Sequence, residues 1–293
     1  MKILLLGKNG QVGWELQRAL APLGELFALD RHDGGDLADG QGLLAKVKAI
    51  APQVIVNAAA YTAVDKAESE PEMAQQINAT APGLLAQEAK ALGALLIHYS
   101  TDYVFDGSGE EARSEEALSA PLSVYGASKL AGEDAIRASG CQHLILRTSW
   151  VYAARGGNFA KTMLRLAAER EQLKVISDQI GAPTGADLLA DLTAHMLRAT
   201  LTRPTLSGTY HAVASGETSW HAYAQHVIEF ARAKGAPIKV RPEQILPIPT
   251  SDYPTPAQRP LNSRLSTNKL QTAFGLTLPA WAVGVERMLT EIL

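Results

Sequence analysis

The first half of the chain alternates short, continuously apolar runs with longer segments of helical periodicity. The apolar runs do not alternate with polar residues, which is typical of parallel strands covered by helices on both faces. Runs of this length between helical segments indicate βαβ units. The predicted strands span residues 3–6, 26–29, 54–57, 95–99 and 144–147, and the predicted helices span residues 12–20, 43–50, 73–92 and 129–138. The pattern predicts an α/β fold built on a doubly wound parallel sheet.

The regular alternation loosens after about residue 150, where prolines interrupt shorter elements, most densely between residues 242 and 260. A doubly wound sheet often carries a smaller appended lobe that binds the substrate. We therefore expect residues 1–150 to form the first domain and residues 151–293 to form mainly a C-terminal substrate-binding lobe. Residues 173–201 are expected to return to the first domain.

A glycine-rich loop, Gly7-Lys8-Asn9-Gly10-Gln11-Val12-Gly13, follows the first predicted strand and opens a helix. Gly7 permits a tight turn, Gly10 lets the backbone approach a pyrophosphate, and Gly13 lets the helix pack closely on the sheet. The free N–H groups at the start of a helix attract an anion. This order of strand, glycine loop and helix predicts a Rossmann-type site for a dinucleotide phosphate.

Asp30 ends the second predicted strand, twenty residues beyond Gly10. A carboxylate at this place accepts hydrogen bonds from an adenosine ribose, which favours NAD. Arg31 and His32 follow immediately, and such side chains can contact the 2′-phosphate of NADP. The cofactor is therefore predicted to be NADH or NADPH, with both left open.

A second group of chemistry-bearing residues follows the fourth predicted strand. Thr101 lies at the carboxyl end of that strand, where open α/β sheets place their ligands. Tyr125 and Lys129 are four residues apart, so on a helix they share one face. Taken alone this spacing is common on solvated helices, but here it comes after a nucleotide loop in the order that an oxidoreductase needs.

Reduction of a ketone requires a hydride and a proton for the forming alkoxide. A free tyrosine has a pKa near 10 and exchanges this proton poorly at neutral pH. An ammonium beside the phenol favours the phenolate and lowers the pKa of the tyrosine. The residues therefore predict Tyr125 as the proton donor, with Lys129 lowering its pKa and Thr101 hydrogen-bonded to the phenol or the substrate oxygen.

Composition narrows the choice of partners. The chain has 293 residues, is 46% hydrophobic and carries a formal net charge of −3 without a Lys/Arg-rich run, so nucleic acid is not the expected partner. Cys141 is the only cysteine and cannot form an internal disulfide, which favours the reducing cytoplasm. No apolar stretch approaches the length of a membrane span. A small-molecule partner is expected, and no membrane.

The glycine loop, Thr101 and the Tyr125/Lys129 pair occupy the relative places that they hold in the extended short-chain dehydrogenase/reductases, which this chain resembles. The resemblance runs over essentially the whole chain. Its longer blocks lie at residues 7–16, 56–68, 100–105, 147–152, 158–160, 178–184 and 259–265. It implies hydride delivery to C4 of a dTDP-linked 4-keto-6-deoxy sugar, with Tyr125 as proton donor, Lys129 on the cofactor ribose and Thr101 tuning the tyrosine.

The resemblance also implies ligand contacts. Cofactor contacts are implied at Gly10, Gln11, Val12, Asp30, Asp36, Leu37, Ala60, Tyr61 and Thr62. The nucleotide sugar is expected at Thr101, Asp102, Tyr125 and Trp150, where the indole offers the sugar a flat apolar face. Some members bind Mg²⁺ at the interface of a homodimer, and Glu15, Asp187 and Glu291 occupy the related positions. Asp187 stands where a longer Glu is expected, and solvated surface acids are the competing interpretation of these three.

Two alternatives to this function stay open at this point. Related reductases and epimerases share the loop and the Tyr/Lys pair, so the chain can act on a different nucleotide sugar. A regulatory subunit of the same fold can instead serve only as a binding module. The intact Thr101, Tyr125 and Lys129 argue against the second alternative.

Overall fold

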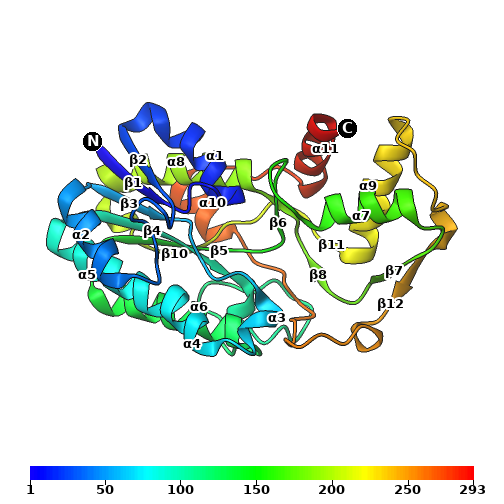
Figure 1. Ribbon diagram of the computed structural model, residues 1–293, viewed down its shortest axis with the longest axis horizontal. Helices are drawn as coiled ribbons and strands as arrows, with labels where there is room; N and C mark the ends of the chain where they lie inside the picture. The colour runs from blue at the N-terminus through cyan, green and yellow to red at the C-terminus, as the bar shows by residue number, and fades with distance from the viewer.

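The computed structural model describes residues 1–293 and is organised around one six-stranded sheet in which every ladder is parallel (Figure 1). The strand order is β10-β5-β4-β3-β1-β2. These strands are β1 (Lys2–Leu6), β2 (Glu25–Leu29), β3 (Val54–Asn57), β4 (Leu95–Thr101), β5 (His143–Thr148) and β10 (Gly208–His211). The five predicted strands lie within the first five of these, and the Rossmann-type α/β fold is confirmed.

The strand order reverses between β1 and β3. From β1 the chain moves outward to β2 and then crosses back to β3 on the other side of β1. The ladder of β1 and β3 ends with Leu6 beside Asn57, and the ladder of β4 and β5 ends with Thr101 beside Thr148. Because ligands of such sheets bind outside the carboxyl ends of the strands at the reversal point, this edge is where a site is expected.

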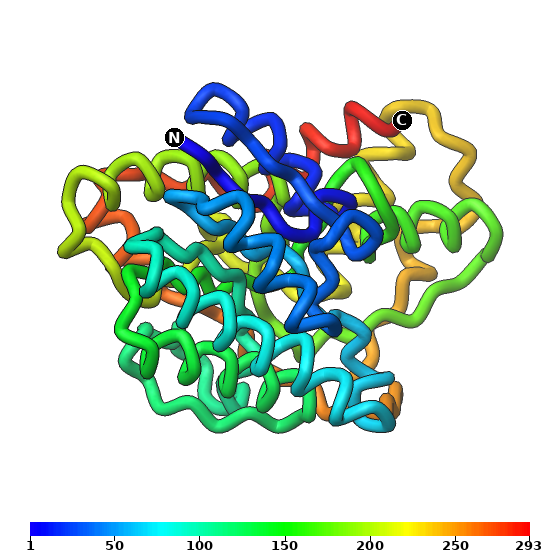
Figure 2. The backbone as a smooth tube through the Cα atoms, turned by 60° about the vertical axis from the view of Figure 1, so that its left-hand side comes forward, coloured from blue at the N-terminus to red at the C-terminus, as the bar shows by residue number.

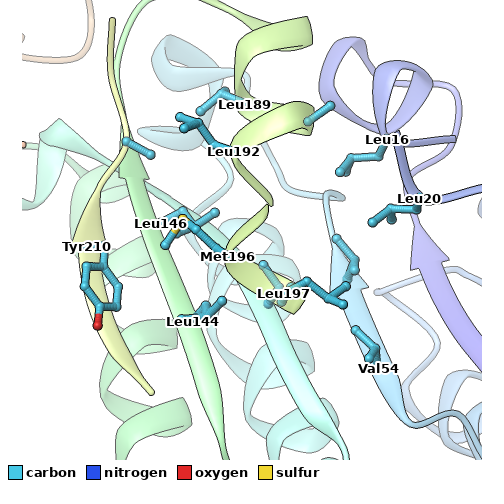
Figure 3. Packing of buried hydrophobic residues seen from close by; sticks show 14 of the residues in the cluster. Leu16, Leu20, Val54, Leu144, Leu146, Leu189, Leu192, Met196, Leu197 and Tyr210 are labelled. Atoms are coloured by element: carbon cyan, nitrogen blue, oxygen red, sulfur yellow. The ribbon is translucent and has the colours of Figure 1, made fainter. Parts of the chain in front are cut away.

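Helices cover both faces of the sheet, which explains the continuously apolar strands. Ile3 and Leu5 join a cluster with α1 (Gln11–Leu20), α8 (Ala186–Thr202) and α10 (Asn268–Phe274), part of which Figure 3 shows. Leu4 and Leu6 point to the opposite face, where α2 (Gly40–Ile50), α5 (Ala81–Leu92) and α6 (Val124–Ser139) pack. No helix in the structure has the length and apolar character that crossing a bilayer requires.

The helix predicted over residues 73–92 is divided. It consists of α4 (Pro71–Gln75), one wider π turn over residues 76–80, and α5. The short helix α3 (Val64–Ala67) precedes it. The π turn carries the buried Asn78, which hydrogen-bonds the backbone of Tyr61 in both directions and the hydroxyl of Ser128. Such turns frequently occur at functional sites.

The second lobe is built from three helices and small ladders. The helices are α7 (Phe159–Glu169), α9 (Trp220–Ala233) and α11 (Trp281–Ile292), which pack around two apolar clusters of their own. The ladders pair β6 (Val151–Tyr152) with β9 (Thr184–Gly185), β7 (Leu173–Ile176) with β12 (Ile245–Ile248), and β8 (Ile180–Gly181) with β11 (Thr218–Ser219). Figure 2 shows the green, yellow and orange segments of this lobe gathered at one side of the molecule.

Several segments after residue 150 join the main sheet or pack on it. Helix α8 packs on α1, strand β10 extends the sheet beyond β5, and α10 packs on the same face. Strand β7 does not join them, contrary to the expectation for residues 173–201, because its ladder partner is β12 in the second lobe. The division of the chain into domains at residue 150 stays a prediction.

Candidate active site

The glycine loop is shaped by contacts that leave no room for side chains. Gly7 has φ +86°, and a Cβ there would lie 2.8 Å from the backbone nitrogen of Ala59. A Cβ on Gly13 would lie 2.0 Å from the carbonyl oxygen of Gly7. Helix α1 begins after Gly10 without a capping side chain, so its first N–H groups face the loop. This main-chain cradle fits a dinucleotide phosphate.

A cavity of about 600 Å³ opens beside this loop, on the carboxyl edge of β1, β2 and β3. Six of the predicted cofactor residues line it: Gly7, Gly10, Asp30, Asp36, Leu37 and Ala60. Gln11, Val12, Gly13, Tyr61 and Thr62 do not line it. Val12 packs against the core, and the N–H of Tyr61 is held by Asn78. Asn9, Met73 and Ile77 line the cavity and were not predicted from the sequence.

Asp30 is held in place by its neighbours. Its carboxylate accepts hydrogen bonds from the side-chain amide of Asn9 (2.5 Å) and from the backbone N–H of His32 (2.8 Å). Lys8 lies 3.8 Å from the same carboxylate and is paired more closely with Asp33. Arg31 and His32 are exposed and line the same cavity. The same cavity is therefore lined by a carboxylate that can bind the ribose and by basic side chains that can bind a 2′-phosphate. This lining is compatible with both NADH and NADPH.

The start of α6 carries Tyr125 toward the end of β4. Ser123 caps the helix by accepting a hydrogen bond from the N–H of Gly126 (3.2 Å). Gly126 lets the helix approach closely, because a Cβ there would lie 2.2 Å from the carbonyl oxygen of Tyr103. The rings of Tyr125 and Tyr103 meet edge to face, with centroids 5.5 Å apart. The hydroxyl of Thr101 is hydrogen-bonded to Tyr125 and lowers the pKa of the phenol.

Burial nevertheless raises the pKa of Tyr125 above its ordinary value, and the charge of Asp102 acts in the same direction. Asp102 is 2% exposed, and burial raises the pKa of its carboxyl to about 6, although its Oδ1 atom accepts a hydrogen bond from Thr101 (3.1 Å). Its Oδ2 atom is buried without a hydrogen-bond partner. The cluster of Thr101, Asp102 and Tyr125 therefore combines a neutral phenol with an unused acceptor at the carboxyl end of β4.

Lys129 lies on the same helix as Tyr125, but its amine is engaged elsewhere. The Nζ atom donates to the carbonyl oxygen of Tyr99 (2.6 Å) and lies 3.2 Å from Nε2 of His98. Burial lowers the pKa of Lys129 to about 8, against the charge of Glu133. The expectation that Lys129 lowers the pKa of Tyr125 is not met in this structure, because the contacts with β4 hold the amine and burial dominates at the phenol.

Trp150 follows β5 at the same edge of the sheet. It has φ +49°, a backbone conformation that non-glycine residues adopt rarely. Its indole stacks on that of Trp220, with centroids 3.7 Å apart and planes 16° from parallel. A Cβ on Gly181 would lie 2.9 Å from the Trp150 ring. Trp220 and Gly181 come from the second lobe, and no local sequence signal connects them with Trp150.

The three acids proposed for a metal line a different cavity of about 410 Å³. Asp187 is paired with Arg287 (2.7 Å), and Glu15 lies 3.4 Å from Arg18. No group of three acidic, histidine or cysteine side chains in the structure is placed to hold a metal ion. The arginines compete for the carboxylates, so the residues present do not fit a Mg²⁺ site in this arrangement.

The parallel sheet, the glycine loop and the Thr101–Tyr125 pair at the end of β4 place the protein among the Rossmann-type NAD(P)-dependent reductases. The family model described as "RmlD substrate binding domain" matches residues 1–293, and the chain belongs to this family. Its relatives include the dTDP-4-dehydrorhamnose reductase of Escherichia coli (strain K12), which is 58% identical over 100% of this chain and 98% of its own length.

Solved structures agree with this family over the whole chain. The dTDP-4-dehydrorhamnose reductase of Clostridium acetobutylicum superposes with a TM-score of 0.89 at 34% identity and covers 100% of this chain and 99% of its own. The enzyme of Bacillus anthracis in complex with NADP has a TM-score of 0.88 at 35% identity, with 99% of each chain covered. The resemblance to the extended short-chain dehydrogenase/reductases is confirmed.

Proposed function

We propose that the chain reduces the C4 keto group of dTDP-4-dehydro-L-rhamnose with NADH or NADPH and forms dTDP-L-rhamnose. Two observations together support this function. Relatives named for this reaction match the chain from end to end at 48–58% identity. The chain also keeps Thr101, Tyr125 and Lys129, which argues against the regulatory-subunit alternative. A different nucleotide sugar has no comparable support among these relatives.

The cofactor is proposed to lie along the carboxyl edge of β1, β2 and β3. The main chain of the glycine loop binds the pyrophosphate, and Asp30 accepts hydrogen bonds from the adenosine ribose. Arg31 and His32 bind a 2′-phosphate when the cofactor is NADPH. The bound dihydronicotinamide supplies the hydride. Gln11, Val12, Gly13, Tyr61 and Thr62 complete the proposed contacts.

The proton is proposed to come from Tyr125. Reduction needs a phenol that is protonated before the reaction, and burial favours this form by raising the pKa of Tyr125. The phenolate that remains must then be stabilised. The hydroxyl of Thr101, which is hydrogen-bonded to Tyr125, lowers the pKa of the phenol and so favours the phenolate. Lys129 is proposed to bind the cofactor ribose through its ammonium group.

The sugar is proposed to lie between the end of β4 and the second lobe. Trp150, stacked on Trp220, presents an apolar ring face to the deoxysugar. The unpartnered Oδ2 of Asp102 is an acceptor for a sugar hydroxyl, and this hydrogen bond would satisfy a buried oxygen that otherwise costs free energy. The partner of the site is thus a small nucleotide sugar.

Three finer statements remain predictions. A homodimer and a cytoplasmic location are expected from the resemblance and from the single cysteine. A role for Mg²⁺ is no part of the proposed mechanism, since Arg18 and Arg287 pair with two of the three acids predicted to bind it, Glu15 and Asp187. Preference between NADH and NADPH is decided by measuring kcat/KM with each cofactor in the wild type and in Arg31→Ala.

The test of the function is the loss of NADPH absorbance with dTDP-4-dehydro-L-rhamnose, repeated for Tyr125→Phe. Removing the proton donor should lower kcat by about 10²- to 10⁴-fold, with the affinity for NADPH unchanged. Tyr103→Phe is the matched control, because it removes the hydroxyl of the neighbouring ring and leaves Tyr125 intact. Turnover only with another nucleotide sugar, or cofactor binding without any turnover, would contradict the proposal.

A further inference from the structure

A series of buried polar side chains connects strands β3 and β4 with helix α6, which carries Tyr125. Asn57 on β3 and His98 on β4 are cross-strand neighbours, each 1% exposed, and Nδ2 of Asn57 lies 3.2 Å from Nδ1 of His98. The other ring nitrogen of His98, Nε2, lies 3.2 Å from Nζ of Lys129 on α6. Lys129 is 2% exposed, so water does not compete for these contacts. The amine of Lys129 is therefore held by a histidine that the reaction described above does not use.

The orientation of Asn57 determines which nitrogen of His98 carries the proton. The backbone N–H of Ala59 points at Oδ1 of Asn57 (3.2 Å), and because a backbone N–H can only donate, this side-chain atom is the oxygen. The NH₂ group of Asn57 then faces His98, and Nδ1 of the ring must accept. A neutral imidazole that accepts at Nδ1 carries its proton on Nε2.

The proton on Nε2 has a consequence for Lys129. Burial and the charge of Lys129 hold the pKa of His98 well below its ordinary value, so the ring is neutral. An ammonium has three donors and no lone pair, so it cannot accept from Nε2–H, whereas a neutral amine can. The hydrogen bond from His98 therefore favours the neutral form of Lys129, in the same direction as burial.

We propose that Asn57 and His98 are positioning residues that select the protonation state of Lys129: Asn57 fixes the tautomer of His98, and the Nε2–H of His98 stabilises the neutral amine. The inference deepens the proposed function, on which it rests for its effect on catalysis. Lys129 then loses its proton at a lower pH than an ordinary lysine does. The reductase would depend on pH through this pair as well as through Tyr125.

The other ionisable groups that face Lys129 are few. Glu133 and Tyr125 stand one turn away on its own helix. The charge of Glu133 raises the pKa of Lys129 against burial, and this carboxylate is itself paired with Arg147 on β5 (2.9 and 2.7 Å) and Arg137 (3.0 Å). Asp102 raises the pKa of Tyr125, and it makes no contact with the amine of Lys129, which is hydrogen-bonded to Tyr99 and lies beside His98. From the π turn, the residue packed against α6 is the uncharged Asn78. His98 is thus the nearest group whose protonation pattern can set that of Lys129.

The first test reads the tautomer directly, without cofactor or substrate. The ring nitrogens of ¹⁵N-histidine-labelled protein are observed by NMR, and His98→Gln assigns the signals among the seven histidines. We expect His98 to be protonated at Nε2 in the wild type and at Nδ1 in Asn57→Asp, because a carboxylate can only accept. A wild-type ring protonated at Nδ1, or an unchanged tautomer in Asn57→Asp, overturns the proposal.

The second test follows the pH dependence of kcat/KM for reduction. In Asn57→Asp, Nε2 becomes an acceptor for the ammonium, so the alkaline limb should move upward by about one pH unit. His98→Gln offers an amide oxygen to Lys129 and should move the limb in the same direction. His211→Gln is the matched control, since His211 is equally buried on β10, away from Lys129, and should lower the melting temperature without moving the limb.

The two tests separate this inference from the proposed function. An inactive wild type with the expected tautomers contradicts the proposed reaction and leaves the Asn57–His98–Lys129 arrangement supported. An active wild type whose alkaline limb stays in place in both Asn57→Asp and His98→Gln overturns the positioning role, whatever the melting temperatures of the variants are.

Discussion

The two sides of the proposed active site differ in the atoms that form their surfaces. On the cofactor side, the glycine loop and the strand ends present main-chain atoms, and added Cβ atoms at Gly7 and Gly13 would meet backbone at 2.8 and 2.0 Å. On the sugar side, side chains form the surface: the stacked indoles of Trp150 and Trp220 and the buried carboxyl of Asp102. The first side is fixed by one continuous sheet, and the second depends on a lobe of two-stranded ladders.

Because of this difference, the two sides should tolerate substitutions to different extents. A main-chain site has no side chain to exchange, so its shape changes only when a new atom forces the backbone apart. A side-chain site can lose one group and keep the rest of its surface. Substitutions on the cofactor side should therefore have larger effects on binding than substitutions on the sugar side.

The largest effect is expected from Gly13→Ala. The new methyl group meets the carbonyl oxygen of Gly7 and pushes α1 away from the loop, and overpacking of this kind costs about 1–3 kcal/mol. The affinity for NADPH, measured by calorimetric titration, should fall by up to about a hundredfold. Gly93→Ala is the control: Gly93 has φ +65° and no atom within 4 Å of its added Cβ, so stability should fall while NADPH affinity does not. Equal NADPH affinity in wild type and Gly13→Ala would contradict the role of this close main-chain contact in binding the cofactor.

A smaller effect is expected from Asp102→Asn, and it depends on pH. Folding raises the pKa of Asp102 from 3.8 to about 6, so the stability linked to this group is fully present below pH 3.8 and is lost as pH rises through about 6. The asparagine variant avoids this loss. Thermal unfolding should show the variant gaining stability relative to wild type above pH 6, on the order of 2 kcal/mol, and no such gain in acid. A difference that is independent of pH would show that Asp102 is not held neutral by burial.

The smallest effect is expected from Trp150→Ala. Loss of one ring face should raise KM for the nucleotide sugar by about tenfold, while the affinity for NADPH stays the same, because the glycine loop is untouched. Trp14→Ala is the matched control, since Trp14 is 45% exposed and lines the other cavity. A parallel loss of NADPH affinity in Trp150→Ala would show that the two sides of the site are coupled.

Much of the first half was predictable because its signals are local. Strand residues that point alternately to two covered faces must all be apolar, and this pattern marks Ile3 to Leu6 without knowledge of the sheet. The spacing of Gly7, Gly10 and Gly13 likewise reports a turn and a close helix contact that span a few residues. The same local reasoning placed Tyr125 and Lys129 on one helix.

Contacts between distant segments were not predictable from local patterns. The ladder of β7 with β12 joins residues about seventy positions apart, and nothing in Leu173–Ile176 distinguishes a partner in the lobe from one in the main sheet. The interruption of the helix over residues 73–92 depends on Asn78, whose side chain reaches Tyr61 and Ser128. The stacking of Trp220 on Trp150 was not predictable either, because Trp220 lies in the second lobe, about seventy residues further along the chain.

The sequence by itself determined the fold class, the dinucleotide loop and the pairing of a tyrosine with a lysine, because hydrophobic periodicity, glycine spacing and helical repeat act within one segment. Only the tertiary structure decided where the amine of Lys129 goes and how basic it is. Burial and the contacts with His98 and Tyr99 come from a neighbouring strand, and the free energy of a buried charge depends on every group that surrounds it in space.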